Sequence, residues 1–199
     1  MKLRDRTLSG FFSSLHFATR GWMLALLFAA LTWSRWKTST PLRVEMLGLI
    51  AVGMLLRAWA GAHLGSHGNG ARAEAPQLVT SGPYAFSRNP LYLSNLAIGA
   101  GLIFFANSLS PQTTVLFLGI LLVHHVALAR WEEKHLRALW TEDYDAYAAA
   151  TPRWFSLRPP PGAQNITETR DWSPVWKRQG RNLVYTLVCI LILWVASRF

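Results

Sequence analysis

The sequence predicts an all-α membrane protein, a polytopic bundle of about five transmembrane helices. Of its 199 residues, 51% are hydrophobic and only 15% are charged, which favours the membrane class over a soluble domain. The apolar residues are also gathered into separate runs along the chain. These runs are Gly21–Trp33, Met46–Leu64, Leu91–Leu109, Thr113–Ala129 and Leu183–Ala196.

The first run is short and follows basic residues, as the core of a secretory signal does. Lys2, Arg4 and Arg6 precede it, but no pair of small residues spaced as a cleavage site follows. We therefore expect an uncleaved signal anchor. The three middle runs come close to the roughly 20 apolar residues that a helix needs to cross the hydrocarbon core.

The connections between the runs predict how the helices pair. Residues 65–90 are rich in Gly, Pro and polar residues and predict a long structured loop. The third and fourth runs are joined by only a few residues around Pro111, which predicts an antiparallel helical hairpin. The outer ends of this hairpin would bring Arg88–Tyr92 close to Arg130–His135.

The polar segments after the hairpin complete the predicted organisation. No stop signal follows Ala129, so we expect the helix to project from the membrane. Thr141 is expected to cap a second short helix that ends before Pro152. A Pro-rich and then basic stretch predicts an extended linker before the last span. The expected units are a basic segment with the first span, a core, a linker and a last span, at residues 1–45, 46–155, 156–182 and 183–199.

The charge distribution predicts the orientation of the chain and its environment. With five spans, most Lys and Arg residues fall on the same side as the N-terminus, so this terminus and the polar motifs are expected in the cytosol. The net charge of +10 is then explained by a basic cytosolic face that is attracted to the anionic headgroups of the bilayer. It does not require a nucleic-acid partner. The sequence does not define an oligomeric state.

The histidines and the single cysteine are the candidate metal ligands of the chain. Only His124 and His125, with His135, approach the His-rich boxes of a di-metal lipid hydroxylase. We therefore expect no metal site and interpret the histidines as packing or interfacial residues. Cys189, the one cysteine, excludes an intramolecular disulfide and a cysteine-based zinc site.

Two motifs on the predicted cytosolic side carry the chemistry. The first runs from Gly82 to Tyr92 and combines a tight turn, aromatic residues, a cation and an amide. Pro90 in this motif suits the first position of a helix, where its missing N–H is not needed and the following amides stay available to an anion.

The second motif runs from Arg130 to Arg153 and contains Glu132-Glu133, Tyr144 and Tyr147. Carboxylates can bind an amino group or hydroxyls, and tyrosine rings can lie against a cation. Adjacent glutamates on a helix point about 100° apart, so only one of them can face a given pocket. Tyr144 and Tyr147 are expected to share a helix face.

Together the motifs resemble the isoprenylcysteine carboxyl methyltransferase family and related phospholipid methyltransferases. Family members have a Gly-x-Tyr leader before Arg-His-Pro-x-Tyr, and Glu-Glu-x-x-Leu with paired tyrosines after a hairpin. This chain has Gly82-Pro83-Tyr84, Arg88-Asn89-Pro90-Leu91-Tyr92, Glu132-Glu133-Lys134-His135-Leu136 and Tyr144-Asp145-Ala146-Tyr147, in the same order.

The resemblance implies an S-adenosylmethionine pocket that the cytosolic loop and short C-terminal helices cap, and a lipid, lipid-linked or isoprenoid acceptor that enters from the bilayer. We assign no residue as a catalytic base. The residues implied for the cofactor are Gln77, Leu78, Val79, Tyr84, Asn89, Pro90, Leu91, Tyr92 and Glu132; Arg57 and Arg130 are candidates for the substrate head.

The departures from the family pattern keep other functions open. Asn89 replaces a histidine and cannot act as an acid or base, and Leu128 stands where prenylcysteine enzymes have an arginine. These two departures weaken the assignment of a prenylcysteine as the substrate. The alternatives are a nicotinamide-dependent membrane reductase of the sterol type and a non-catalytic membrane scaffold with the same fold.

Overall fold

The computed structural model describes residues 21–64, 78–158 and 173–199, and these residues form a bundle of long helices without strands. A helix at 21–36 is followed by the 3-10 turn η1 (Val44–Met46) and α2 (Leu47–Leu64). Next come the short α3 (Pro83–Phe86), α4 (Pro90–Ala106), α5 (Pro111–Ala150) and α6 (Ser173–Ala196). The predicted all-α class is confirmed.

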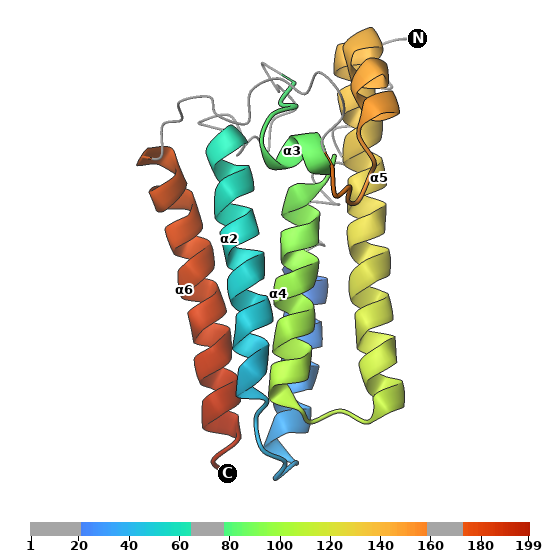
Figure 1. The fold of residues 1–199 in the computed structure, drawn as a ribbon. Coiled ribbons are helices and arrows are strands. Elements are labelled where there is room, and N and C mark those ends of the chain that lie inside the picture. The colour runs from blue at the N-terminus through green and yellow to red at the C-terminus, as the bar shows by residue number, and fades with distance from the viewer. Residues whose placement is uncertain (1–20, 65–77, 159–172) are drawn as a thin grey trace.

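The long helices stand side by side in the order α6, α2, α4 and α5, with residues 21–36 behind α4 (Figure 1). Glycines allow α2 and α4 to approach closely. A Cβ on Gly53 would lie 3.0 Å from the Ser94 carbonyl oxygen, and one on Gly101 would lie 2.5 Å from the Ile50 side chain. Small residues at such crossings let two helix backbones pack tightly within a bilayer.

Among the residues that the structure describes, three helices are long and apolar enough to cross a membrane: Val44–Leu64, Pro111–Ala150 and Gln179–Ala196. The helix Pro90–Ala106 is apolar but shorter. Large apolar side chains such as Leu55, Val115 and Val123 are exposed on the outer surface of the bundle. An apolar surface of this extent requires lipid around it, which indicates an integral membrane protein. The expected number of five spans stays a prediction.

Helix α5 extends beyond the membrane and bends at Thr141. Forty residues at 1.5 Å each give about 60 Å, roughly twice the thickness of the hydrocarbon core. The apolar part ends near Ala129, and the remainder projects from the end of the bundle at which α3 lies (Figure 1). Thr141 has φ 22° and ψ −92°, so the predicted break between two helices is confirmed at this residue.

The last helix begins earlier than the sequence indicated. Helix α6 starts at Ser173, so residues 173–182 of the predicted extended linker are helical, whereas the division of the chain into four units stays a prediction. Pro174 directly follows Ser173 and was the available signal, because proline is common in the first turn of a helix. The hairpin loop is also longer than expected, since α4 ends at Ala106 and Asn107 adopts a left-handed conformation.

Candidate functional site

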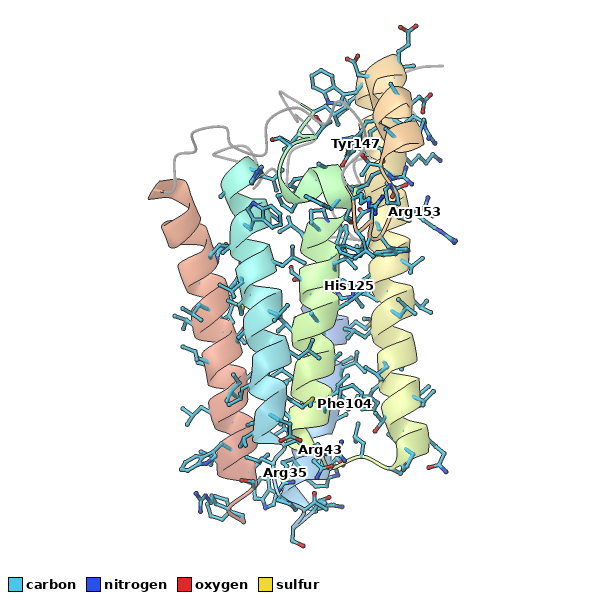
Figure 2. The ribbon with its side chains drawn as sticks, viewed as in Figure 1. Arg35, Arg43, Phe104, His125, Tyr147 and Arg153 are labelled. Carbon is cyan, nitrogen blue, oxygen red and sulfur yellow. The ribbon has the colours of Figure 1, made fainter. Side chains whose placement is uncertain are left out.

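The candidate site lies at the end of the bundle where α3, the start of α4 and the projecting part of α5 meet. Figure 2 labels Tyr147 and Arg153 at this end and Arg35 at the opposite end. Asn89 Nδ2 donates to Glu133 Oε1 at 2.7 Å. The predicted juxtaposition of the two hairpin ends is therefore confirmed, although forty-four positions separate these residues in the chain.

A sharp turn at Gly82 fits α3 against α2. Gly82 has φ 60°, and a Cβ on it would lie 1.6 Å from His63 Nε2. His63 Nδ1 is 2.9 Å from the Trp59 carbonyl oxygen, and the Trp59 ring lies 6.2 Å from that of Phe86. The sequence predicted only a loop here. It predicted neither the helix α3 nor the close packing of His63 against Gly82.

Replacing Gly82 with alanine is expected to destabilise the protein. With φ 60° and ψ −128°, Gly82 adopts a backbone conformation that costs about 1–3 kcal/mol for a residue with a Cβ, and the His63 ring would have to move as well. We expect the melting temperature of the purified protein to fall by about 2–12 °C. Gly48→Ala is the matched control, because nothing lies within 4 Å of a Cβ at that position. Equal melting temperatures for the two variants would show that the turn does not depend on glycine.

Glu133 is the centre of a buried polar cluster with Arg88, Asn89 and Arg153. Arg153 Nε and Nη2 each donate to one of its carboxylate oxygens at 2.9 Å, and Arg88 Nη1 lies 3.5 Å from Oε2. Only 6% of Glu133 is exposed. A bidentate arginine–carboxylate pair fixes both partners in position. We call these four residues the Glu133 cluster.

The electrostatic setting keeps Glu133 ionised. Burial alone would raise the pKa of its carboxyl group, but the hydrogen bonds from Arg153 and Asn89 and the positive charge of Arg88 outweigh burial and lower that pKa below its ordinary value of 4.5. At neutral pH the cluster therefore contains a carboxylate between two guanidinium groups. This arrangement suits a structural tie better than proton transfer.

The chain after α5 returns along the start of α4 and closes this side of the site. Arg88 N–H donates to the Pro152 carbonyl at 3.0 Å, and Ser156 N–H donates to the Phe86 carbonyl at 2.8 Å. Asn89 Nδ2 also donates to the Arg153 carbonyl at 3.2 Å. Residues 151–158 are thus held to residues 86–89 by backbone and side-chain bonds.

Tyr92 and Glu132 form a second, more accessible pair. Tyr92 Oη donates to Glu132 Oε2 at 2.7 Å, and the pair is exposed. The Tyr92 ring lies 6.0 Å from that of His125, a buried residue of α5. The two adjacent glutamates therefore point in different directions, as helical geometry requires, and Glu132 is the one that a ligand can reach.

Tyr84 of α3 is buried beside this pair. Burial raises the pKa of the Tyr84 phenol well above its ordinary range, and the charge of Glu132 raises it further, whereas Arg57 acts in the opposite direction. Tyr84 is therefore neutral at physiological pH. Its carbonyl oxygen accepts a bond from Tyr147 Oη at 2.8 Å, and the Tyr144 and Tyr147 rings lie 6.0 Å apart, as expected for residues on one face.

Those of the remaining predicted cofactor residues that the structure describes lie just before α3 or at the start of α4. Leu78 and Val79 are half-buried and lead into the turn before α3. Pro90 is the first residue of α4, as predicted. The expectation of free amides after it needs correction, since Tyr92 and Leu93 N–H both donate to the Asn89 carbonyl at 3.1 Å. Gln77 lies outside the described residues.

The two arginines nominated for the substrate head lie in different surroundings. Arg57 on α2 donates to Asn95 Oδ1 on α4. With the Asn182 amide turned so that its oxygen faces Arg57, Asn182 also accepts from Arg57 Nε at 3.0 Å. Arg57 is therefore held between α2, α4 and α6. Arg130 is exposed on α5, and the bonds of the Glu133 cluster do not include it.

Within the described ranges 21–64, 78–158 and 173–199, no group of three His, Cys, Asp or Glu side chains is placed to hold a metal ion. The His124 and His125 rings lie 5.2 Å apart, and the His135 ring stacks on that of Trp131 at 5.8 Å. The interpretation of the histidines as packing or interfacial residues stays a prediction.

Comparison with known proteins places the site within a family. The model of the phospholipid methyltransferase family matches residues 43–143. The cobalt-zinc-cadmium resistance protein CzcN of Cupriavidus metallidurans is 33% identical over 134 residues, which are 67% of this chain and 57% of that protein. The nickel-cobalt-cadmium resistance protein NccN of Alcaligenes xylosoxydans xylosoxydans is 28% identical over 134 residues, 67% of this chain and 58% of that protein.

The chain thus spans less than two thirds of the length of these relatives, and no solved structure matches it significantly. The family match covers half of the chain and includes α2, α3, α4 and α5 up to the residues just after the bend. Tyr84, Asn89, Tyr92 and Glu132 all lie within it. The chain therefore belongs to the phospholipid methyltransferase family.

Proposed function

We propose that the protein is an integral membrane methyltransferase that uses S-adenosylmethionine and acts on a lipid, a lipid-linked or an isoprenoid acceptor. The observation that carries the proposal is the exposed Tyr92–Glu132 pair beside the buried Tyr84. It brings together a carboxylate and two aromatic rings within the residues that match the family. A sulfonium cofactor with an ammonium group and ribose hydroxyls needs such partners.

Each residue has a distinct role in this proposal. Glu132 would bind the amino group or the ribose hydroxyls of the cofactor, and the Tyr84 and Tyr92 rings would lie against its positive end. Leu78 and Val79, with Gln77, would contact the adenosyl group. Asn89, whose amide is bonded to Glu133, would position the start of α4, at Pro90 and Leu91, against the cofactor.

The chemistry requires alignment more than acid or base strength. When bound, S-adenosylmethionine supplies an electrophilic methyl group, and the carbon–sulfur bond breaks as the bond to an oxygen, nitrogen or sulfur acceptor forms. The protein would hold the acceptor in line and exclude water. Tyr84 is neutral because burial raises its pKa, and we assign no catalytic base.

An apolar pocket supports a lipid acceptor. It has a volume of about 500 Å³ and lies between Met23 of the first helix and α5, whose lining residues run from Val115 to Ala127 and include His124. His124 contacts His125, which contacts Tyr92. A hydrocarbon chain in this pocket would therefore lead toward the Tyr92–Glu132 pair. Arg57 and Arg130 remain the proposed contacts for a charged substrate head.

The proposal is tested with membranes that contain the protein and methyl-labelled S-adenosylmethionine. Extracted lipids are separated, and label is expected in a lipid fraction only when the protein is present. A parallel titration of purified protein with S-adenosylhomocysteine and NADPH separates the alternatives. Binding of NADPH alone would favour a reductase, and binding of neither compound would favour a scaffold; both results contradict the proposal. The cytosolic orientation would be tested by labelling cysteines introduced near Glu132 from either side of the membrane.

A further inference from the structure

A second polar site lies at the opposite end of the bundle from the Tyr92–Glu132 pair. An open pocket of about 300 Å³ is formed where the first helix ends, the segment before η1 passes, and α6 ends. Figure 2 labels Arg35 at this end, far from Tyr147 and Arg153. The polar and aromatic residues that line the pocket are Arg35, Ser39, Thr40, Trp194, Ser197 and Arg198.

Arg35 is the unusual member of this pocket, because only 2% of it is exposed. Its Nη1 donates to the Ala106 carbonyl at 3.0 Å and to Thr40 Oγ1 at 3.1 Å, whereas its Nε is buried with no hydrogen-bond partner. In the part of the chain that the structure describes, none of the ion pairs involves Arg35.

These partners do not account for a buried guanidinium group. Ala106 ends α4, so its carbonyl carries part of the negative end of the helix dipole and stabilises Arg35 to some extent. Both acceptors are nevertheless neutral. A buried cation is costly unless a full negative charge compensates it, and the pocket is the space from which an anion can reach Arg35.

The surroundings of the pocket are those of a membrane headgroup layer. Lys37 Nζ lies 4.5 Å from the centre of the Trp33 ring, and the Arg198 guanidinium lies 4.6 Å from that of Trp194. Trp33, Trp194 and Phe199 are exposed. Exposed aromatic residues with adjacent cations are typical of the boundary between hydrocarbon and headgroups.

We propose that this pocket binds a phosphate group, with Arg35 and Arg198 as its two cations and the hydroxyls of Ser39 and Thr40 beside them. Guanidinium groups match the geometry of phosphate oxygens. The phosphate belongs to an anionic membrane lipid or is free inorganic phosphate. The site lies on the other side of the membrane from the proposed methyl transfer and does not depend on that function.

The test uses the full chain, purified and stripped of lipid in detergent. Binding of phosphatidylglycerol, diacylglycerol and inorganic phosphate is measured by native mass spectrometry and by the shift in melting temperature. We expect one saturable site for an anionic ligand and binding about tenfold weaker in Arg198→Gln, because a charge-assisted hydrogen bond is lost. Arg198 carries the test because Arg35 also caps α4, and its replacement could unfold the protein.

Arg43→Gln is the matched control. It removes the same charge at the same end of the bundle, but Arg43 does not line the pocket, so ligand binding by this variant should equal that of the wild type.

The outcomes separate the two sources of phosphate. Saturation by phosphatidylglycerol alone identifies a lipid site, and equal saturation by inorganic phosphate identifies a free-phosphate site; either supports the proposal. Equal weakening in Arg198→Gln and Arg43→Gln, or equal binding of phosphatidylglycerol and of diacylglycerol, which has no phosphate, would overturn it. Glu132→Gln should leave this binding unchanged, which separates it from the proposed cofactor site.

Discussion

Replacing Glu132 with glutamine is expected to weaken the binding of S-adenosylhomocysteine by about tenfold to a hundredfold. A hydrogen bond to a charged group contributes about 1.5–3 kcal/mol, and each 1.4 kcal/mol corresponds to about a tenfold change in affinity. Glutamine keeps the length of the side chain, and its amide oxygen can still accept from Tyr92 Oη. The loss therefore reports the negative charge and not the shape of the site.

Calorimetric titration of the purified protein measures this effect, and two further variants sharpen it. Tyr92→Phe removes the partner of Glu132 but keeps the ring, so we expect a smaller loss of up to about tenfold. Glu142→Gln is the control, since Glu142 is an exposed acid farther along α5. Because Glu132 is exposed, its replacement should leave the melting temperature nearly unchanged. Wild-type affinity in both Glu132→Gln and Tyr92→Phe would remove these residues from the proposed site.

The parts of the site that sequence reasoning could predict are those fixed by chain connectivity. A short link at Pro111 forces two apolar helices into a hairpin, so Asn89 had to approach Glu133. The proline after Asn89 predicted that α4 would begin at Pro90, because proline suits the first position of a helix. These predictions depended on local rules with few alternatives, and the structure confirmed them.

The parts that could not be predicted depend on packing between distant segments. Helical geometry required the two glutamates to diverge, but only the return of residues 151–158 determines that Glu133 is the buried one. Arg153 reaches Glu133 because the helix breaks at Thr141 and the chain turns back, which no local pattern near Arg153 reveals. The Arg88 and Arg153 contacts were missed as a pair for this reason, although both residues stood out in the motifs.

The other large effect is expected for Glu133→Ala, which should destabilise the protein by about 3 kcal/mol, the lower end of the cost of breaking a buried ion pair. Arg88, whose side chain is 12% exposed, would lose its carboxylate and remain buried, whereas Arg153, whose side chain is 35% exposed, would keep part of its hydration. Loss of the cluster would also release residues 151–158 from the start of α4. Melting temperature and protease sensitivity after Thr151 measure the two consequences.

The pH dependence distinguishes this role from that of Glu132. The folded pKa of Glu133 is below its ordinary value, so its stabilising contribution is fully present above that value and is lost as the pH falls through the folded pKa. The melting temperature of the wild type should therefore decrease as the pH falls below about 4.5, the ordinary value from which linkage begins. Glu133→Gln should begin lower and show a flatter profile, whereas Glu132→Gln should follow the wild type. A profile of Glu133→Gln that parallels the wild type would show that another carboxylate controls acid stability.

Cofactor binding separates the two glutamates in a second way. Because Asn89 donates to Glu133 and precedes α4, Glu133→Gln should weaken cofactor binding and lower the melting temperature together. Glu132→Gln should weaken cofactor binding alone.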